Sequence, residues 1–230
     1  MKGLRIFTTL LSVIMTGTVQ AKAPPTQVVY RFDDHRYLEL KGFNCEGELW
    51  FIDTQRKIHS EVASQFYRIF THKFVHPSER YIAITSWEAD GFAVSKDYGQ
   101  TWQVATFSSG PNEPDGMNQA PRGDAISFTV VNEQGFLQTK HSLYMSSKPF
   151  DDLRLASGGG GIQYRINNDN YEITPQFPGP KWGMSYMTMR GLEHDVAHYQ
   201  TNWQDLPDQV PEVKAYKGWD HMSCDMDAGK

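Results

Sequence analysis

The chain is poor in cysteine, in positive charge and in long apolar runs. It has two cysteines, and its 22 Lys and Arg residues are outnumbered by 27 Asp and Glu residues, which gives a formal net charge of −5. A negative net charge disfavours nucleic acid and anionic membrane surfaces as partners. Beyond the N-terminal segment no apolar stretch is long enough for a membrane-spanning helix, so we expect no stable membrane insertion.

The sequence also lacks the common signatures of hydrolases and nucleotide-binding enzymes. The hydrolase pattern G-x-S-x-G is absent, because Gly183–Met187 departs from it at the last residue. The glycine run Gly158–Gly161 is not followed by the Gly-Lys-Ser/Thr of a phosphate-binding loop. His194 and His198 would share a face only on a helix, and no third metal ligand stands at a suitable spacing. We therefore expect no enzyme, no catalytic residues, no metal and no cofactor.

The N-terminus has the form of an export signal. Two basic residues precede the apolar segment Ile6–Met15, which is too short to span a bilayer, and small residues follow up to Ala21. We expect cleavage after Ala21, which makes residues 1–21 a signal peptide and residues 22–230 a single domain. The mature chain would then be soluble in the periplasm. An uncleaved N-terminal anchor is the alternative.

The two cysteines, Cys45 and Cys224, lie near the two ends of the expected mature chain. An even and small number of cysteines in an exported protein favours a disulfide, because the compartment is oxidising. Such a bond would join the first and last elements of the fold. Two buried free thiols are the alternative.

The pattern S-x-D-x-G-x-T-W, called an Asp-box, is formed by Ser95, Asp97, Gly99, Thr101 and Trp102. It is typical of a turn between two antiparallel strands. Asp97 is expected to accept hydrogen bonds from backbone N–H groups of its own turn, and Gly99 to supply an unusual backbone dihedral. Trp102 offers a large ring to a neighbouring sheet. This pattern resembles the Asp-boxes of sialidase-type β-propeller blades, which indicates a fold and not a chemistry.

Short strands joined by tight turns recur along the chain. The segments around the Asp-box predict three strands, Tyr81–Ser86, Phe92–Ser95 and Trp102–Phe107. Similar segments occur at Gly47–Asp53, Ser127–Thr139 and Leu143–Ser147. Leu49, Phe92 and Leu143 stand 43 and 51 residues apart, near the ~40–50 residues typical of blades. We expect an all-β, β-propeller-like fold, with a β-sandwich of hairpins as the alternative. Only residues 186–199 form a stretch that could hold a helix of any length.

The whole mature chain resembles a family of bacterial type VI secretion immunity proteins, which neutralise antibacterial lipase or phospholipase effectors of the third class. The resemblance rests on Tyr30–Leu40, Phe66–Phe70, Phe74–Ile82, the Asp-box, Ser127–Thr139, Leu143–Asp152, Asn202–Pro207 and Gly218–Cys224. It implies a periplasmic protein that binds and inhibits a lipase delivered by a neighbouring or sibling cell. The competing hypothesis is an exported, propeller-type protein that binds or processes glycans.

Two polar segments interrupt the rhythm of strands, at Gly110–Asp124 and Gly158–Thr174. The second predicts a hairpin, with strands at Ile162–Ile166 and Tyr171–Thr174 joined by a polar turn. Long polar loops on a rigid scaffold often carry recognition residues. Under the immunity hypothesis we expect the effector to contact these segments, since Tyr and Arg are enriched at binding hot spots. The candidate effector-binding residues are Met117, Arg122, Tyr164, Arg165 and Tyr171.

Overall fold

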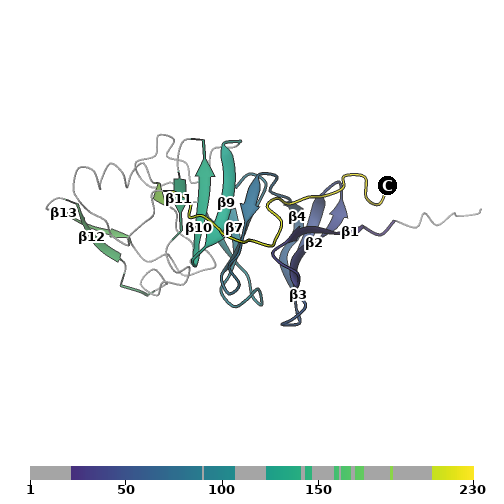
Figure 1. Ribbon diagram of the computed structural model, residues 1–230, viewed down its shortest axis with the longest axis horizontal. Helices are drawn as coiled ribbons and strands as arrows, with labels where there is room; N and C mark the ends of the chain where they lie inside the picture. Colours follow the sequence, from purple (N-terminus) through teal and green to yellow (C-terminus); the bar gives the residue numbers. More distant parts are fainter. Residues whose placement is uncertain are drawn as a thin grey trace, which may run out of the picture.

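The computed structural model describes residues 22–89, 91–106, 123–140, 143–146, 158–160, 162–166, 169–173, 187–188 and 209–230. Every regular secondary-structure element within these ranges is a β-strand (Figure 1), which confirms the predicted all-β class. In the described part of the chain, no helix has the length and apolar character needed to cross a membrane.

The first sheet is a four-stranded antiparallel meander in the order β1-β2-β3-β4. Its strands are β1 (Thr26–Arg31), β2 (Arg36–Phe43), β3 (Glu46–Asp53) and β4 (Ile58–Arg68). Alternate residues of β2 and β3, such as Leu38, Leu40 and Leu49, are buried, which is the period-two pattern of a sheet with one face on the core. Asn44 and Cys45 form the tight turn between β2 and β3, and both have positive φ.

The second sheet contains the strands that the sequence predicts around Asp97. They are β6 (Ile82–Thr85), β7 (Gly91–Ser95) and β8 (Gln103–Thr106), paired antiparallel in this order. Their boundaries lie within one or two residues of the expected ones, because apolar alternation and turn residues both mark them.

The third sheet has the order β14-β11-β10-β9-β5. Its strands are β5 (Lys73–Val75), β9 (Ala125–Val131), β10 (Gln134–Thr139), β11 (Leu143–Met145) and β14 (Met187–Thr188). Strand β5 pairs with β9 in parallel, whereas all other pairs are antiparallel. Strand β14 lies inside residues 186–199, the one stretch long enough for a helix by sequence, and Met187 and Thr188 extend the sheet beside β11 there.

A separate hairpin is formed by β12 (Ile162–Ile166) and β13 (Asp169–Ile173). The sequence predicts this hairpin within Gly158–Thr174, and the observed pairing of the two strands confirms it.

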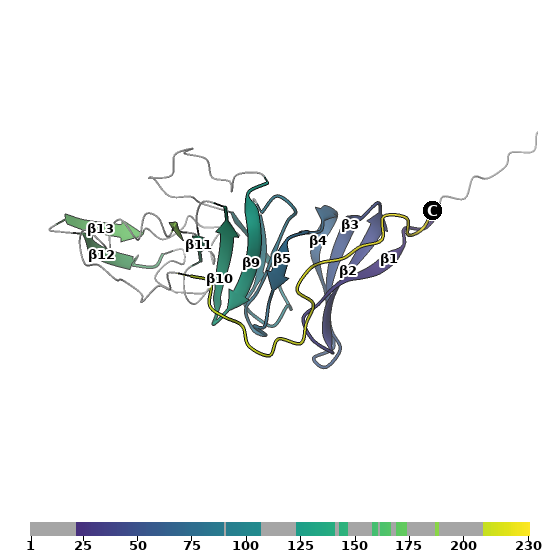
Figure 2. The ribbon, with the colours of Figure 1, turned by 45° about the horizontal axis from the view of Figure 1, so that its top comes forward.

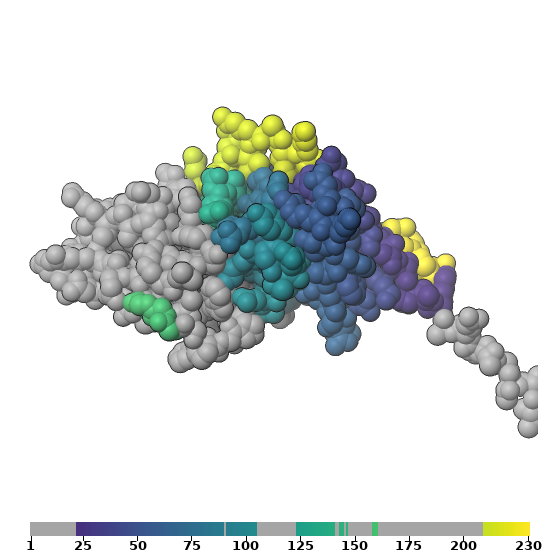
Figure 3. All heavy atoms as spheres, turned by 90° about the horizontal axis from the view of Figure 1, so that it is seen from below, coloured from purple at the N-terminus to yellow at the C-terminus, as the bar shows by residue number. Residues whose placement is uncertain are grey.

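The C-terminal segment, residues 209–230, runs back across the molecule to β1 (Figures 1 and 2). The N–H groups of Trp219 and Ser223 donate to the carbonyls of Arg31 and Val29, at 2.8 and 2.9 Å. The carbonyl of Asp220 accepts from the N–H of Phe74 in β5, at 2.7 Å. The segment therefore covers the free edge of β1 and also bonds the third sheet. In the space-filling view it lies over both regions (Figure 3).

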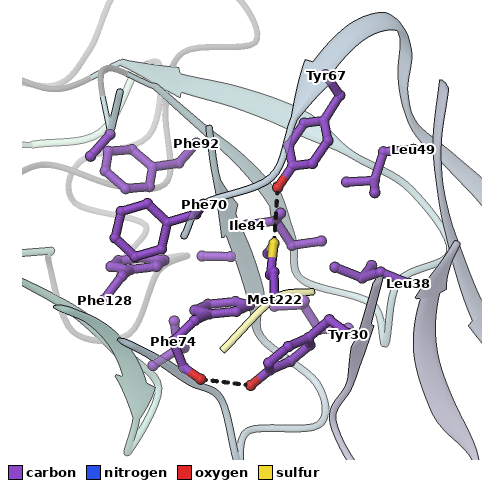
Figure 4. Packing of buried hydrophobic residues seen from close by; sticks show 14 of the residues in the cluster. Tyr30, Leu38, Leu49, Tyr67, Phe70, Phe74, Ile84, Phe92, Phe128 and Met222 are labelled. Atoms are coloured by element: carbon purple, nitrogen blue, oxygen red, sulfur yellow. Dashed lines mark hydrogen bonds between the residues drawn. The ribbon is translucent and has the colours of Figure 1, made fainter. Parts of the chain in front are cut away.

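The hydrophobic core takes side chains from all three larger sheets and from the C-terminal segment (Figure 4). The rings of Phe74 and Phe128 stack with centroids 5.8 Å apart. Tyr67 donates its hydroxyl proton to the carbonyl of Thr85, at 3.0 Å, and its oxygen lies 3.4 Å from the sulfur of Met222. Fully burying such a side chain contributes about 1.5–3 kcal/mol, so this shared core holds the sheets together.

Successive antiparallel meanders are what a propeller and a sandwich of hairpins have in common. No sheet among the described residues closes into a barrel. The propeller-like arrangement of blades therefore stays a prediction, with the sandwich as its alternative.

Candidate functional site: an interaction surface and its scaffold

The Asp97 turn connects β7 to β8 and has the hydrogen bonds expected from the sequence. Oδ1 of Asp97 accepts from the backbone N–H groups of Gln100 and Thr101, at 3.1 and 2.9 Å, and Oδ2 accepts from the Thr101 hydroxyl at 2.6 Å. Ser95 donates to Oδ1 at 2.8 Å. Partial burial opposes ionisation, but these donors outweigh it and hold the pKa of Asp97 below its ordinary value.

The same turn packs against the first sheet. Trp102 donates its indole N–H to the Ser60 hydroxyl at 2.9 Å, and its ring meets that of Phe51 edge to face with centroids 5.7 Å apart. The Ser60 hydroxyl in turn donates to the carbonyl of Gly99. The contact that the sequence predicts between Trp102 and a neighbouring sheet is confirmed. The Asp97 turn thus joins two sheets as part of the scaffold.

A buried polar cluster lies where β1, β2 and the residues after β5 meet. The guanidinium of Arg36 is buried, donates to Asp33 at 2.7 Å and donates to the carbonyl of Ser78 at 2.7 Å. His76 is fully buried, and its Nε2 accepts from the N–H of Ala83 at 3.0 Å. Burial, and then the charge of Arg36, lower the pKa of His76 to about 3. The ring is therefore neutral at neutral pH and acts as an internal hydrogen-bond acceptor.

Asp33, Asp34 and His35 bring their ligand atoms within 4.8 Å of one another, a spacing that a metal ion could use. Both carboxylate oxygens of Asp33 already accept hydrogen bonds within the protein. Oδ1 accepts from the N–H groups of His35 and Arg36, and Oδ2 accepts from the Arg36 side chain. Partial burial opposes ionisation of Asp33, but these donors outweigh it and lower its pKa. The group is a hydrogen-bonded turn between β1 and β2 in which Arg36 neutralises the charge of Asp33. It gives no support for a bound metal.

The disulfide predicted between Cys45 and Cys224 is present. Cys45 lies in the β2–β3 turn and Cys224 in the C-terminal segment, so residues 179 apart in sequence are joined. Met222, two residues before Cys224, is buried in the core. The disulfide and Met222 together fasten the C-terminal segment to the first sheet.

The effector-binding candidates from the sequence fall into two groups. Met117 and Arg122 lie outside the described residues. Tyr164, Arg165 and Tyr171 lie in the β12–β13 hairpin, where Tyr164 and Tyr171 are direct cross-strand partners. The pairing places Tyr164 opposite Tyr171 and Arg165 opposite Asn170, and the role of these residues in binding stays a prediction.

Sequence reasoning missed three exposed aromatic residues, two in the first sheet and one in the turn between β6 and β7. Phe66 is 72% exposed, Trp87 is 49% exposed and Phe43 is 40% exposed. The guanidinium of Arg68 lies over the Trp87 ring, 5.6 Å from its centroid, and Arg68 also pairs with Glu46 at 2.6 Å. Exposed aromatic clusters beside an Arg are typical of protein–protein contact surfaces. The signal in the sequence was weak, because aromatic residues in strands usually belong to the core.

Two comparisons with known proteins bear on this surface and its scaffold. A family model described as "T6SS Tli3 immunity protein" matches residues 22–139, just over half of the 230-residue chain. The matched part includes the first two sheets, the Asp97 turn, Cys45 and the three exposed aromatic residues. No curated protein matches the chain.

Proposed function

The chain belongs to the family of T6SS Tli3 immunity proteins, and on that premise we propose that it binds and inhibits a type VI secreted lipase or phospholipase. The effector would come from a neighbouring or sibling cell, and inhibition would protect the cell that makes this chain. The observation that carries the proposal is the family match over residues 22–139. The lipase class of the effector rests on the resemblance of the whole chain to immunity proteins against such enzymes.

The architecture supports an inhibitor that acts by binding alone. Such a protein needs a rigid scaffold that presents side chains to a partner, and reactive groups are not required. The disulfide and the shared core provide rigidity, and exposed aromatic and Arg side chains provide contact area. Among the described residues, the buried polar side chains of Arg36 and His76 are engaged in internal hydrogen bonds.

We further propose that the protein works in the periplasm. Residues 1–21 have the features of a cleaved export signal. A disulfide between Cys45 and Cys224 is compatible with an oxidising compartment. Cell fractionation should recover a chain that begins at Lys22 in the periplasmic fraction, and recovery of the uncleaved chain in the membrane fraction would contradict this location.

The decisive experiment titrates the purified chain against the lipase effector encoded beside its gene. Lipase activity should fall to background near a one-to-one ratio, and the two proteins should co-elute from a sizing column. Full activity at a stoichiometric amount of this chain would refute the proposal. An unrelated type VI lipase is the matched control, because an immunity protein should leave it active.

The effector contact that the sequence predicts in the β12–β13 hairpin needs a test of its own. Replacing both Tyr164 and Tyr171 by Ser keeps the hairpin length and removes two aromatic side chains that are cross-strand partners. If the hairpin binds the effector, calorimetry should show at least tenfold weaker binding. Binding as tight as that of the wild type would exclude the hairpin from the interface.

A further inference from the structure

Phe66 combines two unusual properties. Its aromatic side chain is 72% exposed, and its backbone φ is +58°, in the left-handed region that bulky residues rarely adopt. Strained backbone positions of this kind persist only where surrounding contacts enforce them, and they concentrate at functional sites. At Phe66 the backbone is constrained by a bulge in β4 and by the buried neighbour Tyr67.

A bulge in β4 places Phe66 outside the regular pairing with β3. Gly47 is paired with Tyr67 but Leu49 is paired with Ala63, so residues 64–66 have no counterpart in the register. Tyr67 then turns into the core, where its hydroxyl donates to Thr85 and meets the sulfur of Met222. Because Tyr67 is anchored inside, its neighbour Phe66 is held on the outside. Bulges commonly re-aim side chains in this way.

Phe66 lies two residues before Arg68 on β4, and contacts of Arg68 join residues from two sheets. Phe43 is paired with Glu46, and Glu46 with Arg68, so these three lie side by side across β2, β3 and β4. Arg68 bridges from Glu46 to Trp87, which stands in the turn between β6 and β7. We name these residues the Phe66 patch: Phe43, Glu46, Phe66, Arg68 and Trp87.

Three features of the Phe66 patch suit a tight protein contact. Phe, Trp and Arg are the residue types enriched in the centres of interfaces. The one pair of opposite charges is already formed, so an apolar partner would not leave an unpaired ion behind. The side chains are also held in place before binding, by the Tyr67 anchor and by the disulfide at Cys45, next to Glu46.

We propose that the Phe66 patch is the surface through which this chain docks on its effector, and that the effector presents an apolar pocket of protein surface that receives Phe66. The inference rests on the proposed immunity function and adds the place of binding. A membrane is the less favoured occupant, because the chain has a net charge of −5 and the patch itself contains Glu46.

The test compares variants in binding to the purified, catalytically inactive effector encoded beside the gene of this chain. Phe66→Asn removes the ring and supplies a residue that tolerates the left-handed backbone, so the fold should be as stable as the wild type or more so. Trp87→Ala removes the second ring. Val104→Ala is the control, because Val104 is a comparably exposed apolar residue on β8, outside the patch.

Calorimetry should show at least tenfold weaker binding for Phe66→Asn and Trp87→Ala, and binding within twofold of wild type for Val104→Ala. If the wild type binds the effector and both patch variants bind within twofold of it, the proposed docking surface is wrong. If the wild type itself does not bind, the proposed function fails and the docking surface fails with it. Loss of co-sedimentation with anionic phosphatidylglycerol vesicles, with effector affinity kept, would overturn the proposal in favour of a membrane contact.

Discussion

The ring of Phe51 lies directly against the backbone of Gly99. A methyl group added at Gly99 would come within 2.3 Å of Cε1 of Phe51, and the φ of Gly99 is +87°. Phe51 belongs to β3 and Gly99 to the Asp97 turn, so this contact joins two sheets at a point where no side chain fits. The glycine is therefore required twice, for its backbone conformation and for the approach of the ring.

Replacing Gly99 by Ala is expected to destabilise the fold by about 2–4 kcal/mol, through backbone strain together with displacement of Phe51. Gly123→Ala is the matched control, because Gly123 also has positive φ, +78°, but nothing lies within 4 Å of the added methyl group. Chemical denaturation should show a clearly smaller loss for Gly123→Ala. Equal losses for the two variants would mean that the Phe51 contact contributes nothing.

Asp97→Ala is expected to destabilise the fold by about 1–3 kcal/mol, because the N–H groups of Gln100 and Thr101 lose their acceptor. Effector affinity should remain that of the wild type, once the fraction of folded protein is taken into account, because the turn packs on the first sheet. Calorimetry at a temperature well below the melting transition checks this. A large loss of affinity at unchanged stability would place the Asp97 turn in the interface.

Cleavage of the Cys45–Cys224 disulfide is expected to cost about 5 kcal/mol in the chain-entropy description, because the bond closes a loop of 179 residues. Mass spectrometry of periplasmic protein should find the chain two hydrogens lighter than the reduced form. Reductant should lower the melting temperature of the wild type and leave that of Cys45→Ser unchanged. Two thiols that alkylate freely in the oxidised, folded protein would contradict the bond.

The sequence predicted those parts of the fold whose cause is local. The strands around Asp97 follow from turn residues and alternation within one short segment. The β12–β13 hairpin is marked in the same way by polar residues between two apolar runs. The Cys45–Cys224 bond followed from export and from the count of cysteines. In each case the deciding information lies in the segment itself or in the composition of the chain.

The parts that were missed depend on contacts between distant segments. The parallel pairing of β5 with β9 is not indicated by the sequence of either strand. Met187 and Thr188 carry no strand signal of their own, yet pairing with β11 makes them a strand. The exposure of Phe66 is set by Tyr67, Thr85 and Met222, which come together only in the folded chain. The sequence around Phe66 shows an aromatic residue in a strand and does not indicate that its backbone φ is positive.

His76 is expected to make the fold less stable in mild acid. Burial, and then the charge of Arg36, lower its pKa from 6.5 in the unfolded chain to about 3 in the folded one. The unfolded chain therefore binds a proton between about pH 6.5 and pH 3 that the folded chain does not. The contribution of His76 to stability is complete above about pH 6.5 and is lost as the pH falls toward about 3.

The expected loss between pH 7 and pH 5 is about 2 kcal/mol from this residue, measured by urea denaturation at each pH. Asp33 and Asp97 have pKa values lowered from 3.8, so their contributions to stability are lost only at more acidic pH. These two carboxylates therefore do not account for a loss of stability between pH 7 and pH 5. His76→Gln keeps an acceptor for the N–H of Ala83 but has no group that titrates, so its stability should change less between pH 5 and pH 7 than that of the wild type. An equal pH dependence of the two proteins would show that the buried ring does not couple folding to proton uptake.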